Sequence, residues 1–168
     1  SLVIPVFNEE ESLPHLWAKI HAVLASEDWA WEVIFVDDGS TDASFAALGK
    51  LAGEYPQVRA VRFRRNYRKA AALAAGFKEA RGQIIITMDG DGQNDPADAP
   101  RLLDHYLASG CENHVMIAGH RVNRRDTWLK RASSRVANGV RLALLDDATP
   151  DTGCGLKVFP RRAFLEMP

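Results

Sequence analysis

The chain has 168 residues, of which 46% are hydrophobic and 26% charged, and its formal net charge is -1. This is the composition of a globular domain, and the near-neutral charge argues against a nucleic-acid-binding protein, which usually has a clear basic excess. Two cysteines are too few for a disulfide scaffold and no apolar run is long enough for a transmembrane helix, so a reducing, cytoplasmic setting is expected.

Short apolar runs alternate with amphipathic stretches along the chain. The runs are rich in Val, Ile and Phe, as buried strands are. Strands are predicted, in chain order, over 2–7, 32–37, 58–63, 83–88, 115–119 and 156–159. Helices are predicted between them, over 10–26, 42–54, 69–81, 97–109 and 126–145. This order predicts an α/β fold with a mostly parallel central sheet and helices on both faces.

We expect the whole chain, residues 1–168, to form a single domain. Its length suits one domain, and no internal repeat or low-complexity segment divides it. The last residues, 163–165, read as part of a helix, so we also expect the domain to be truncated at its C-terminus.

Polar clusters follow three of the predicted strands. Asn8-Glu9 follows the first, Asp37-Asp38-Gly39-Ser40 the second and Asp89-Gly90-Asp91 the fourth. In open α/β sheets, ligands bind outside the carboxyl ends of the strands. We therefore expect the three clusters to converge on one crevice.

The carboxylates of Asp89 and Asp91 suit a divalent cation. Mg²⁺ or Mn²⁺ is typically held by one or two carboxylates, and substrate phosphates fill further positions. The polar residues Gln93, Asn94 and Asp95 follow closely and favour this interpretation. The competing interpretation is a polar turn that closes the strand.

Asp37 and Asp38 also allow two interpretations. A carboxylate at a strand end can accept hydrogen bonds from a nucleobase or ribose, as acids do in dinucleotide folds. The other interpretation is a turn in which Ser40 or Thr41 caps the next helix, and the two are compatible.

Basic residues are concentrated in two segments. Residues 59–69 carry six and no acid, and residues 121–135 carry six with one acid. They form either solvated faces or the bases that hold a phosphate-bearing ligand opposite metal-binding acids. P-loop, dinucleotide-binding glycine and serine-elbow motifs are absent from the sequence, which argues against P-loop NTPases, dehydrogenases and serine hydrolases.

Five sequence blocks, taken together and in order, resemble glycosyltransferase family 2. They lie at 5–10, 37–40, 89–96, 119–138 and 151–157. Within the family the chain looks like the polyprenyl-phosphate sugar transferases, which include dolichyl-phosphate mannose synthases and undecaprenyl-phosphate aminoarabinose transferases. The similarity covers nearly the whole chain.

The resemblance implies a Rossmann-like GT-A domain. It also implies inverting transfer of a sugar from a UDP- or GDP-linked donor to a polyprenyl phosphate, with Mg²⁺ or Mn²⁺ as cofactor. The acceptor lipid would place the protein at the inner, cytoplasmic face of a membrane. Because a phosphate monoester is already ionised near neutral pH, such an acceptor needs positioning more than deprotonation.

Site residues follow from the positions that match the family's motifs. Nucleotide-sugar binding is expected of Pro5, Phe7, Asn8, Glu9, Asp37, Asp38, Gly39, Lys69, Asp89, Gly90, Gln93 and Arg124. Metal binding is expected of Asp89, Asp91 and Gln93. Catalytic roles are expected of Asp91, Asp151, Arg121 and Arg131. The arginines would meet the donor or acceptor phosphates, and Asp151 would act either as a general base or as a positioning group.

The chain departs from the family pattern at two places. Arg68-Lys69 stands where many relatives have Gly followed by Gln or Lys, so the entrance of the site is expected to differ. Gly90 and Gly92 stand where many relatives have Ala or Leu, which suggests local flexibility.

Three other functions are compatible with parts of the sequence. A family member that acts on a saccharide or other hydroxyl acceptor would need a true base, so Asp151→Asn should abolish its turnover. A non-catalytic nucleotide-binding module would bind UDP or GDP with metal but transfer no sugar. A sugar nucleotidyltransferase is disfavoured, because its Gly-rich signature with Arg and Lys is missing after the first strand.

Overall fold

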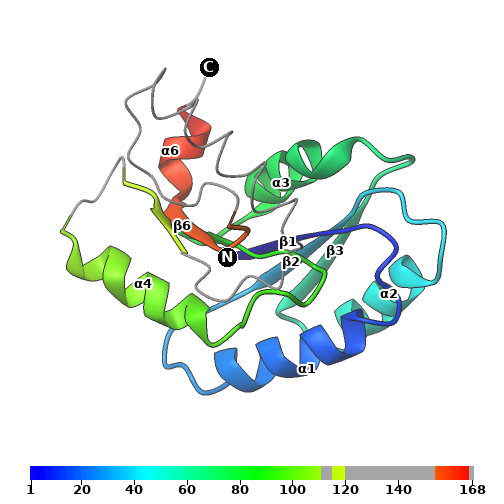
Figure 1. Ribbon diagram of the computed structural model, residues 1–168, viewed down its shortest axis with the longest axis horizontal. Helices are drawn as coiled ribbons and strands as arrows, with labels where there is room; N and C mark the ends of the chain where they lie inside the picture. The colour runs from blue at the N-terminus through cyan, green and yellow to red at the C-terminus, as the bar shows by residue number, and fades with distance from the viewer. Residues whose placement is uncertain (111–114, 120–153, 167–168) are drawn as a thin grey trace, which may run out of the picture.

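The computed structural model describes residues 1–110, 115–119 and 154–166. In chain order its elements are β1 (Leu2–Val6), α1 (Leu13–Leu24), β2 (Val33–Asp37), α2 (Ser44–Glu54), β3 (Val58–Arg62), α3 (Arg68–Glu79), β4 (Ile84–Thr87), α4 (Asp98–Ala108), β5 (Ile117–Ala118), β6 (Lys157–Pro160) and α6 (Arg161–Leu165). The strands form one sheet in the order β3-β2-β1-β4-β6-β5 (Figure 1). The helix predicted over 126–145 lies outside the described residues.

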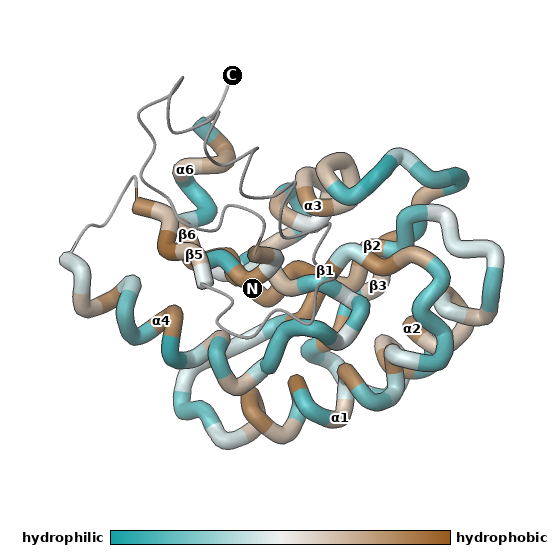
Figure 2. Tube along the Cα trace, in the orientation of Figure 1, coloured by the Kyte–Doolittle hydropathy of each residue, from teal (hydrophilic) through white to brown (hydrophobic). Residues whose placement is uncertain are grey.

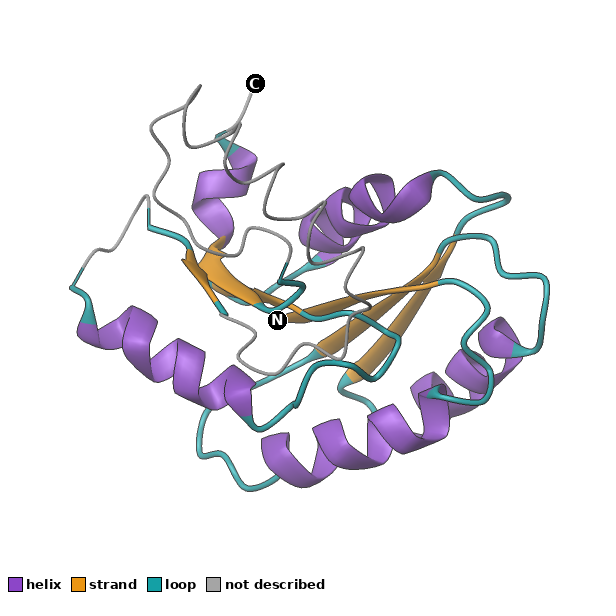
Figure 3. Ribbon diagram, viewed as in Figure 1, coloured by secondary structure: helices purple, strands orange, loops and turns teal. Residues whose placement is uncertain are grey.

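The sheet is mostly parallel, as the alternation of elements predicted. Strand β1 pairs in parallel with β2 and β4, and β2 pairs in parallel with β3. Strand β6 pairs antiparallel with both β4 and β5. Helices α1, α2 and α4 cover one face, and α3 and α6 cover the other (Figure 3). The predicted α/β architecture is therefore confirmed.

Each face of the sheet has its own apolar core. Ile4 and Phe35 point to the side of α1, α2 and α4 and are fully buried there. Val3 and Ile34 point to the opposite side, where Ala72 of α3 packs against them. Because both faces are covered, the central strands are almost continuously apolar (Figure 2).

Two helices begin later than predicted, and one capping prediction is wrong. Helix α1 starts at Leu13 instead of residue 10, which leaves Glu9 in the preceding loop. Helix α2 starts at Ser44, and neither Ser40 nor Thr41 caps it. Ser40 Oγ instead accepts a hydrogen bond from another loop. The reason is that Ser40 and Thr41 lie three or more residues before the first residue of α2, Ser44, too far to cap it. Their hydroxyl groups instead bond to Asn8, in the loop that follows β1.

Gly76 sets the distance between α3 and the sheet. A Cβ atom at this position would lie 2.3 Å from Val3 Cγ1 and 3.2 Å from Val36 Cγ2. The missing side chain lets α3 lie directly on β1 and β2. As a result the first turn of α3, which carries Arg68 and Lys69, lies at the carboxyl edge of the sheet.

Glu32 connects three segments at the opposite edge of the sheet. It accepts hydrogen bonds from the Ser1 hydroxyl at 2.6 Å and from the backbone N–H groups of Arg81 at 2.7 Å and Gly82 at 3.3 Å. Burial by itself raises the pKa of Glu32, but these hydrogen bonds outweigh it and lower that pKa below its usual value. The ionised form of Glu32 therefore stabilises the fold.

Candidate functional site

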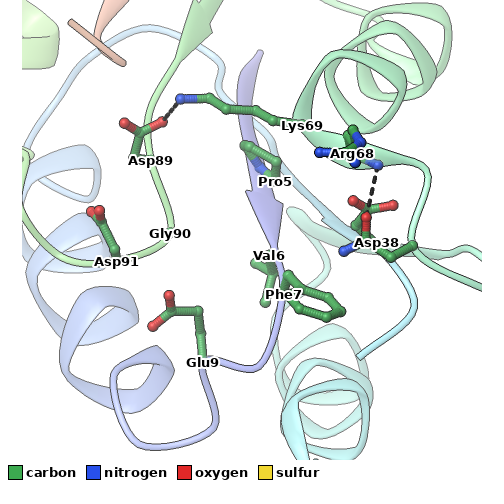
Figure 4. Close-up of a pocket in the computed structure, with 11 residues that line it drawn as sticks. Pro5, Val6, Phe7, Glu9, Asp38, Arg68, Lys69, Asp89, Gly90 and Asp91 are labelled. Atoms are coloured by element: carbon green, nitrogen blue, oxygen red, sulfur yellow. Dashed lines mark hydrogen bonds and ion pairs between the residues drawn. The ribbon is translucent and has the colours of Figure 1, made fainter. Parts of the chain in front are cut away.

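A pocket of about 390 Å³ opens at the carboxyl ends of β1, β2 and β4 (Figure 4). Its lining combines polar, charged and apolar side chains: Pro5, Val6, Phe7, Glu9, Asp38, Asn66, Arg68, Lys69, Asp89, Gly90 and Asp91. The three polar clusters that follow these strands all contribute to it, as their positions in the sequence predicted. The volume lies in the range of small-molecule sites.

The pocket has two chemically different ends. Asp89 and Asp91 lie on one side of Pro5, and Asp38 and Arg68 lie on the other (Figure 4). Asp38 is buried, and its Oδ1 accepts a hydrogen bond of 2.7 Å from the backbone N–H of Tyr67. This bond ties the end of β2 to the loop before α3, so both segments form one wall.

Asn8 fastens the two loops that carry Glu9 and Asp38. Its backbone is in the left-handed region, with φ at +55°. Its N–H donates to Ser40 Oγ at 2.9 Å, and its Oδ1 accepts from the N–H of Thr41 at 2.8 Å. Asn8 is not among the residues that line the pocket, so the structure gives it a place in the loop framework.

Asp37 and Gly39, two further predicted nucleotide-binding residues, also lie outside the pocket lining. Asp37 is fully buried; its Oδ1 accepts the N–H of Ser40 at 3.0 Å, and its Oδ2 lies 3.4 Å from Arg62 Nε. Gly39 has φ at +74°, and a Cβ there would lie 2.4 Å from the backbone carbon of Arg65. Both residues shape the turn that presents Asp38.

Three contacts define the position of Asp89. Its Oδ1 forms an ion pair with Lys69 Nζ, which reaches across the pocket from α3 (Figure 4). Its N–H donates to Asn94 Oδ1 at 3.3 Å. A Cβ at Gly155 would lie 2.2 Å from Asp89 Oδ2, so only glycine at 155 leaves room for the carboxylate where it stands.

The two glycines of the acidic loop are placed differently. A Cβ at Gly90 would lie 2.8 Å from the backbone oxygen of Pro5, so this glycine lets the acidic loop pack closely against β1. Gly92 has φ at +71° and open space around it. The flexibility that the sequence suggested for this loop stays a prediction.

The donor groups present fit a divalent cation that is completed by substrate. Asp89 and Asp91 both line the pocket, and among the described residues no group of three or more His, Cys, Asp or Glu side chains could hold a metal. Two carboxylates with phosphate oxygens are a common way to bind Mg²⁺. Gln93, the third predicted ligand, lines a separate hollow with Lys19 and Pro96, and the structure does not bring it to the pocket.

Val6, Asn66 and Arg68 line the pocket but were not assigned from the sequence. The signal that could have found the last two is the third predicted strand, whose carboxyl end lies at the same edge of the sheet. Four other predicted residues lie outside the described ranges: Arg121, Arg124, Arg131 and Asp151. No helix within the described ranges is long and apolar enough to cross a membrane.

The family model described as "Glycosyl transferase family 2" matches residues 1–167. The chain belongs to glycosyltransferase family 2. Its resemblance to that family, first seen in five short blocks, therefore extends along nearly its whole length.

Two relatives illustrate where the chain lies in the family. It is 37% identical over 163 residues to the undecaprenyl-phosphate 4-deoxy-4-formamido-L-arabinose transferase of Sodalis glossinidius, covering 96% of this chain and 48% of the relative. It is 39% identical over 161 residues to the dodecaprenyl-phosphate galacturonate synthase of Rhizobium johnstonii, covering 95% and 47%. The chain thus spans about half the length of the curated relatives it matches.

Solved glycosyltransferase structures share the fold. Glucosyl-3-phosphoglycerate synthase from Mycobacterium tuberculosis, solved with Mn²⁺, UDP-glucose and phosphoglyceric acid, aligns with a TM-score of 0.72 and 20% identity, over 95% of this chain and 55% of that one. A mannosyltransferase from Pyrobaculum calidifontis, solved with GDP-mannose and Mn²⁺, aligns with a TM-score of 0.61 and 23% identity, over 95% and 43%. The expected GT-A fold is confirmed.

Proposed function

We propose that this family 2 domain transfers a sugar, with inversion, from a nucleotide-diphosphate donor to a polyprenyl phosphate at the cytoplasmic face of a membrane. Relatives at 37% and 39% identity, named for undecaprenyl- and dodecaprenyl-phosphate substrates, support this acceptor class. The observation that carries the proposal is that one pocket combines an acidic end at Asp89 and Asp91 with a second end at Asp38.

The nucleoside half of the donor binds at the Asp38 end. The Phe7 ring lines the pocket and is 43% exposed, which is unusual for a phenylalanine and gives a base an apolar surface to lie against. The Asp38 carboxylate accepts hydrogen bonds from a base or ribose. Pro5 lies between the two ends and supports the donor where nucleoside and diphosphate meet.

The diphosphate binds at the Asp89 end. There Asp89 and Asp91 would hold Mg²⁺ or Mn²⁺, which neutralises the charge that develops on the leaving nucleoside diphosphate. Lys69 lines the same pocket and pairs with Asp89, and it exchanges this partner for a phosphate oxygen when the donor enters. Such a charged hydrogen bond is stronger than one between neutral groups.

The acceptor phosphate supplies an oxygen that is already ionised near neutral pH, so binding and alignment are the main tasks of the protein. The resemblance to the family assigns the donor or acceptor phosphates to Arg121, Arg131 and Arg124, and it assigns Asp151 to positioning or proton acceptance. Guanidinium groups bind phosphate in a bidentate manner, which fixes the direction of attack.

Calorimetric titration of UDP and GDP, with and without Mn²⁺, tests the donor site. We expect metal-dependent binding of one nucleotide, weakened at least about tenfold in Asp91→Ala, because a ligand carboxylate is lost. Asp98→Ala is the matched control, since this acid of α4 forms an ion pair with Arg101 at the surface and is not among the residues that line the pocket. Binding that needs no metal and survives Asp91→Ala would reject the site.

Transfer assays then separate the acceptor classes. Transfer to undecaprenyl phosphate supports the proposal. Transfer only to a saccharide hydroxyl, abolished in Asp151→Asn, would instead support the hydroxyl-acceptor alternative. Nucleotide and metal binding with no transfer to either acceptor would indicate a non-catalytic module.

A further inference from the structure

Arg68 has a backbone conformation that its residue type disfavours. Its φ is +74°, in the left-handed region, and Asn8 is the one other non-glycine residue of the described ranges with positive φ. Asparagine adopts this region readily because its short side chain bonds locally, whereas arginine has no such compensation. Backbone strain of this kind persists only where surrounding contacts enforce it.

Two backbone hydrogen bonds enforce the strained turn. The N–H of Arg68 donates to Asn66 Oδ1 at 3.0 Å, and the preceding N–H, of Tyr67, donates to Asp38 Oδ1 at 2.7 Å. The guanidinium of Arg65 lies 4.9 Å from the centre of the Tyr67 ring and holds that side chain. The turn is thus built into the pocket wall, and Arg68 lines the pocket next to Asp38 (Figure 4).

The charge of Arg68 is not used by the fold. Within the described ranges its side chain makes no hydrogen bond and no ion pair, whereas the neighbouring Lys69 is paired with Asp89. A glycine at position 68 would relieve the strain, so fold stability gives no reason for an arginine there. An unpaired cation on a strained turn in a pocket wall points to a ligand.

We infer that Arg68 is a donor-recognition residue that hydrogen-bonds the nucleoside half of the nucleotide beside Asp38. This inference rests on the proposed function. Lys69, Asp89 and Asp91 belong to the diphosphate end, whereas Arg68 and Asp38 share the opposite end. Asp38 offers an acceptor and Arg68 offers donors, which together match a ring N–H beside a carbonyl oxygen. Uracil and guanine present that pair of groups, and adenine and cytosine do not.

Three substitutions separate the charge of Arg68 from its strain. Arg68→Gln removes the charge and keeps the strained turn, Arg68→Lys keeps the charge, and Arg68→Gly removes both. Arg64→Gln is the matched control, because the exposed Arg64 lies in the same loop and is not among the residues that line the pocket. Each purified variant is titrated with UMP, UDP, GMP and GDP in the presence of Mn²⁺, and its melting temperature is recorded.

We expect Arg68→Gln and Arg68→Gly to weaken the bound nucleotide about tenfold or more, by the same factor for the monophosphate and the diphosphate. Arg68→Lys should retain most of the affinity, and Arg64→Gln should bind like the unmodified protein. Arg68→Gly should also raise the melting temperature by about 2–4 °C, because glycine adopts the left-handed backbone conformation without strain.

Three outcomes would overturn the inference. Unchanged affinity in both Arg68→Gln and Arg68→Gly would show that Arg68 does not contact the nucleotide. A larger loss for UDP than for UMP would place Arg68 on the diphosphate instead of the nucleoside. If the unmodified protein binds none of the four nucleotides, the proposed function itself fails. This result is distinguishable from the other two, in which the unmodified protein does bind a nucleotide.

Discussion

Gly155 is the position where one methyl group should disable the site while the fold remains intact. A Cβ at 155 would lie 2.2 Å from Oδ2, 2.3 Å from Cγ and 2.5 Å from Oδ1 of Asp89. Ordinary contact begins near 3.4 Å, so the carboxylate would have to move by about 1 Å. The φ of Gly155 is not in the left-handed region, so alanine itself causes no backbone strain there.

The displaced group is the Asp89 side chain at the pocket, so the substitution should weaken ligand binding and leave the stability of the fold nearly unchanged. Loss of alignment by about 1 Å typically lowers turnover about a hundredfold, and a displaced ligand lowers metal affinity about 10–100-fold. We therefore expect Gly155→Ala to weaken Mn²⁺-dependent UDP or GDP binding by that range. Its melting temperature should stay within a few degrees of the unmodified protein, by the scale on which about 1 kcal/mol shifts it 2–4 °C.

Calorimetric titration of the nucleotide at fixed Mn²⁺, beside a thermal melt, measures both effects. Gly53→Ala is the matched control: Gly53 lies in α2, and a Cβ there would meet nothing within 4 Å. That variant should bind nucleotide normally. Equal affinity in Gly155→Ala and Gly53→Ala would refute the reasoning, because the close approach of Gly155 to Asp89 would then have no consequence.

Three predictions concern stability. The folded-state pKa of Glu32 is lowered, so its contribution to stability is fully present above the unfolded-state pKa and is lost as pH falls through the folded-state pKa. The urea midpoint of Glu32→Gln should therefore lie below that of the unmodified protein at pH 7, and the two midpoints should converge as the solution is acidified below the usual glutamate pKa. A difference that does not depend on pH would contradict this. Asn8→Ala removes the hydrogen bond from Thr41 and forces alanine to adopt φ of +55°, so the free energy of unfolding in urea should fall by about 1–3 kcal/mol. Asn8→Gly should lower it less, because glycine adopts this φ without strain. Equal losses in the two variants would show that backbone strain contributes nothing. Gly76→Ala forces a methyl group against Val3 and should lower the free energy of unfolding by about 1–3 kcal/mol. An unchanged urea unfolding curve would show instead that α3 can shift away from the sheet without loss of stability.

The alternation of apolar runs and amphipathic stretches was sufficient to predict the sheet and helices α1 to α4. The bounds of all six strands agree with the prediction within two residues. The reason is local: a strand buried on both faces must be apolar throughout, and the helices that cover it must be amphipathic. Helix starts were less accurate, because loops such as the one before α1 pair with other loops.

The acids that follow a buried strand were also predictable. Glu9, Asp38, Asp89 and Asp91 lie at the carboxyl edge because parallel strands all end there, wherever the loops then turn. Sequence spacing therefore located the pocket and the residue types that it contains.

Only the tertiary structure decided which neighbours face the pocket. Asp37 and Asp38 are adjacent acids, yet Asp37 turns into the core toward Arg62 while Asp38 forms the pocket wall. Successive side chains at a strand end point to opposite sides, and one residue of offset separates the two roles. Likewise, the room that Gly155 leaves for Asp89 and the turn that brings Arg68 beside Asp38 depend on contacts between segments far apart in the chain, which no local pattern records.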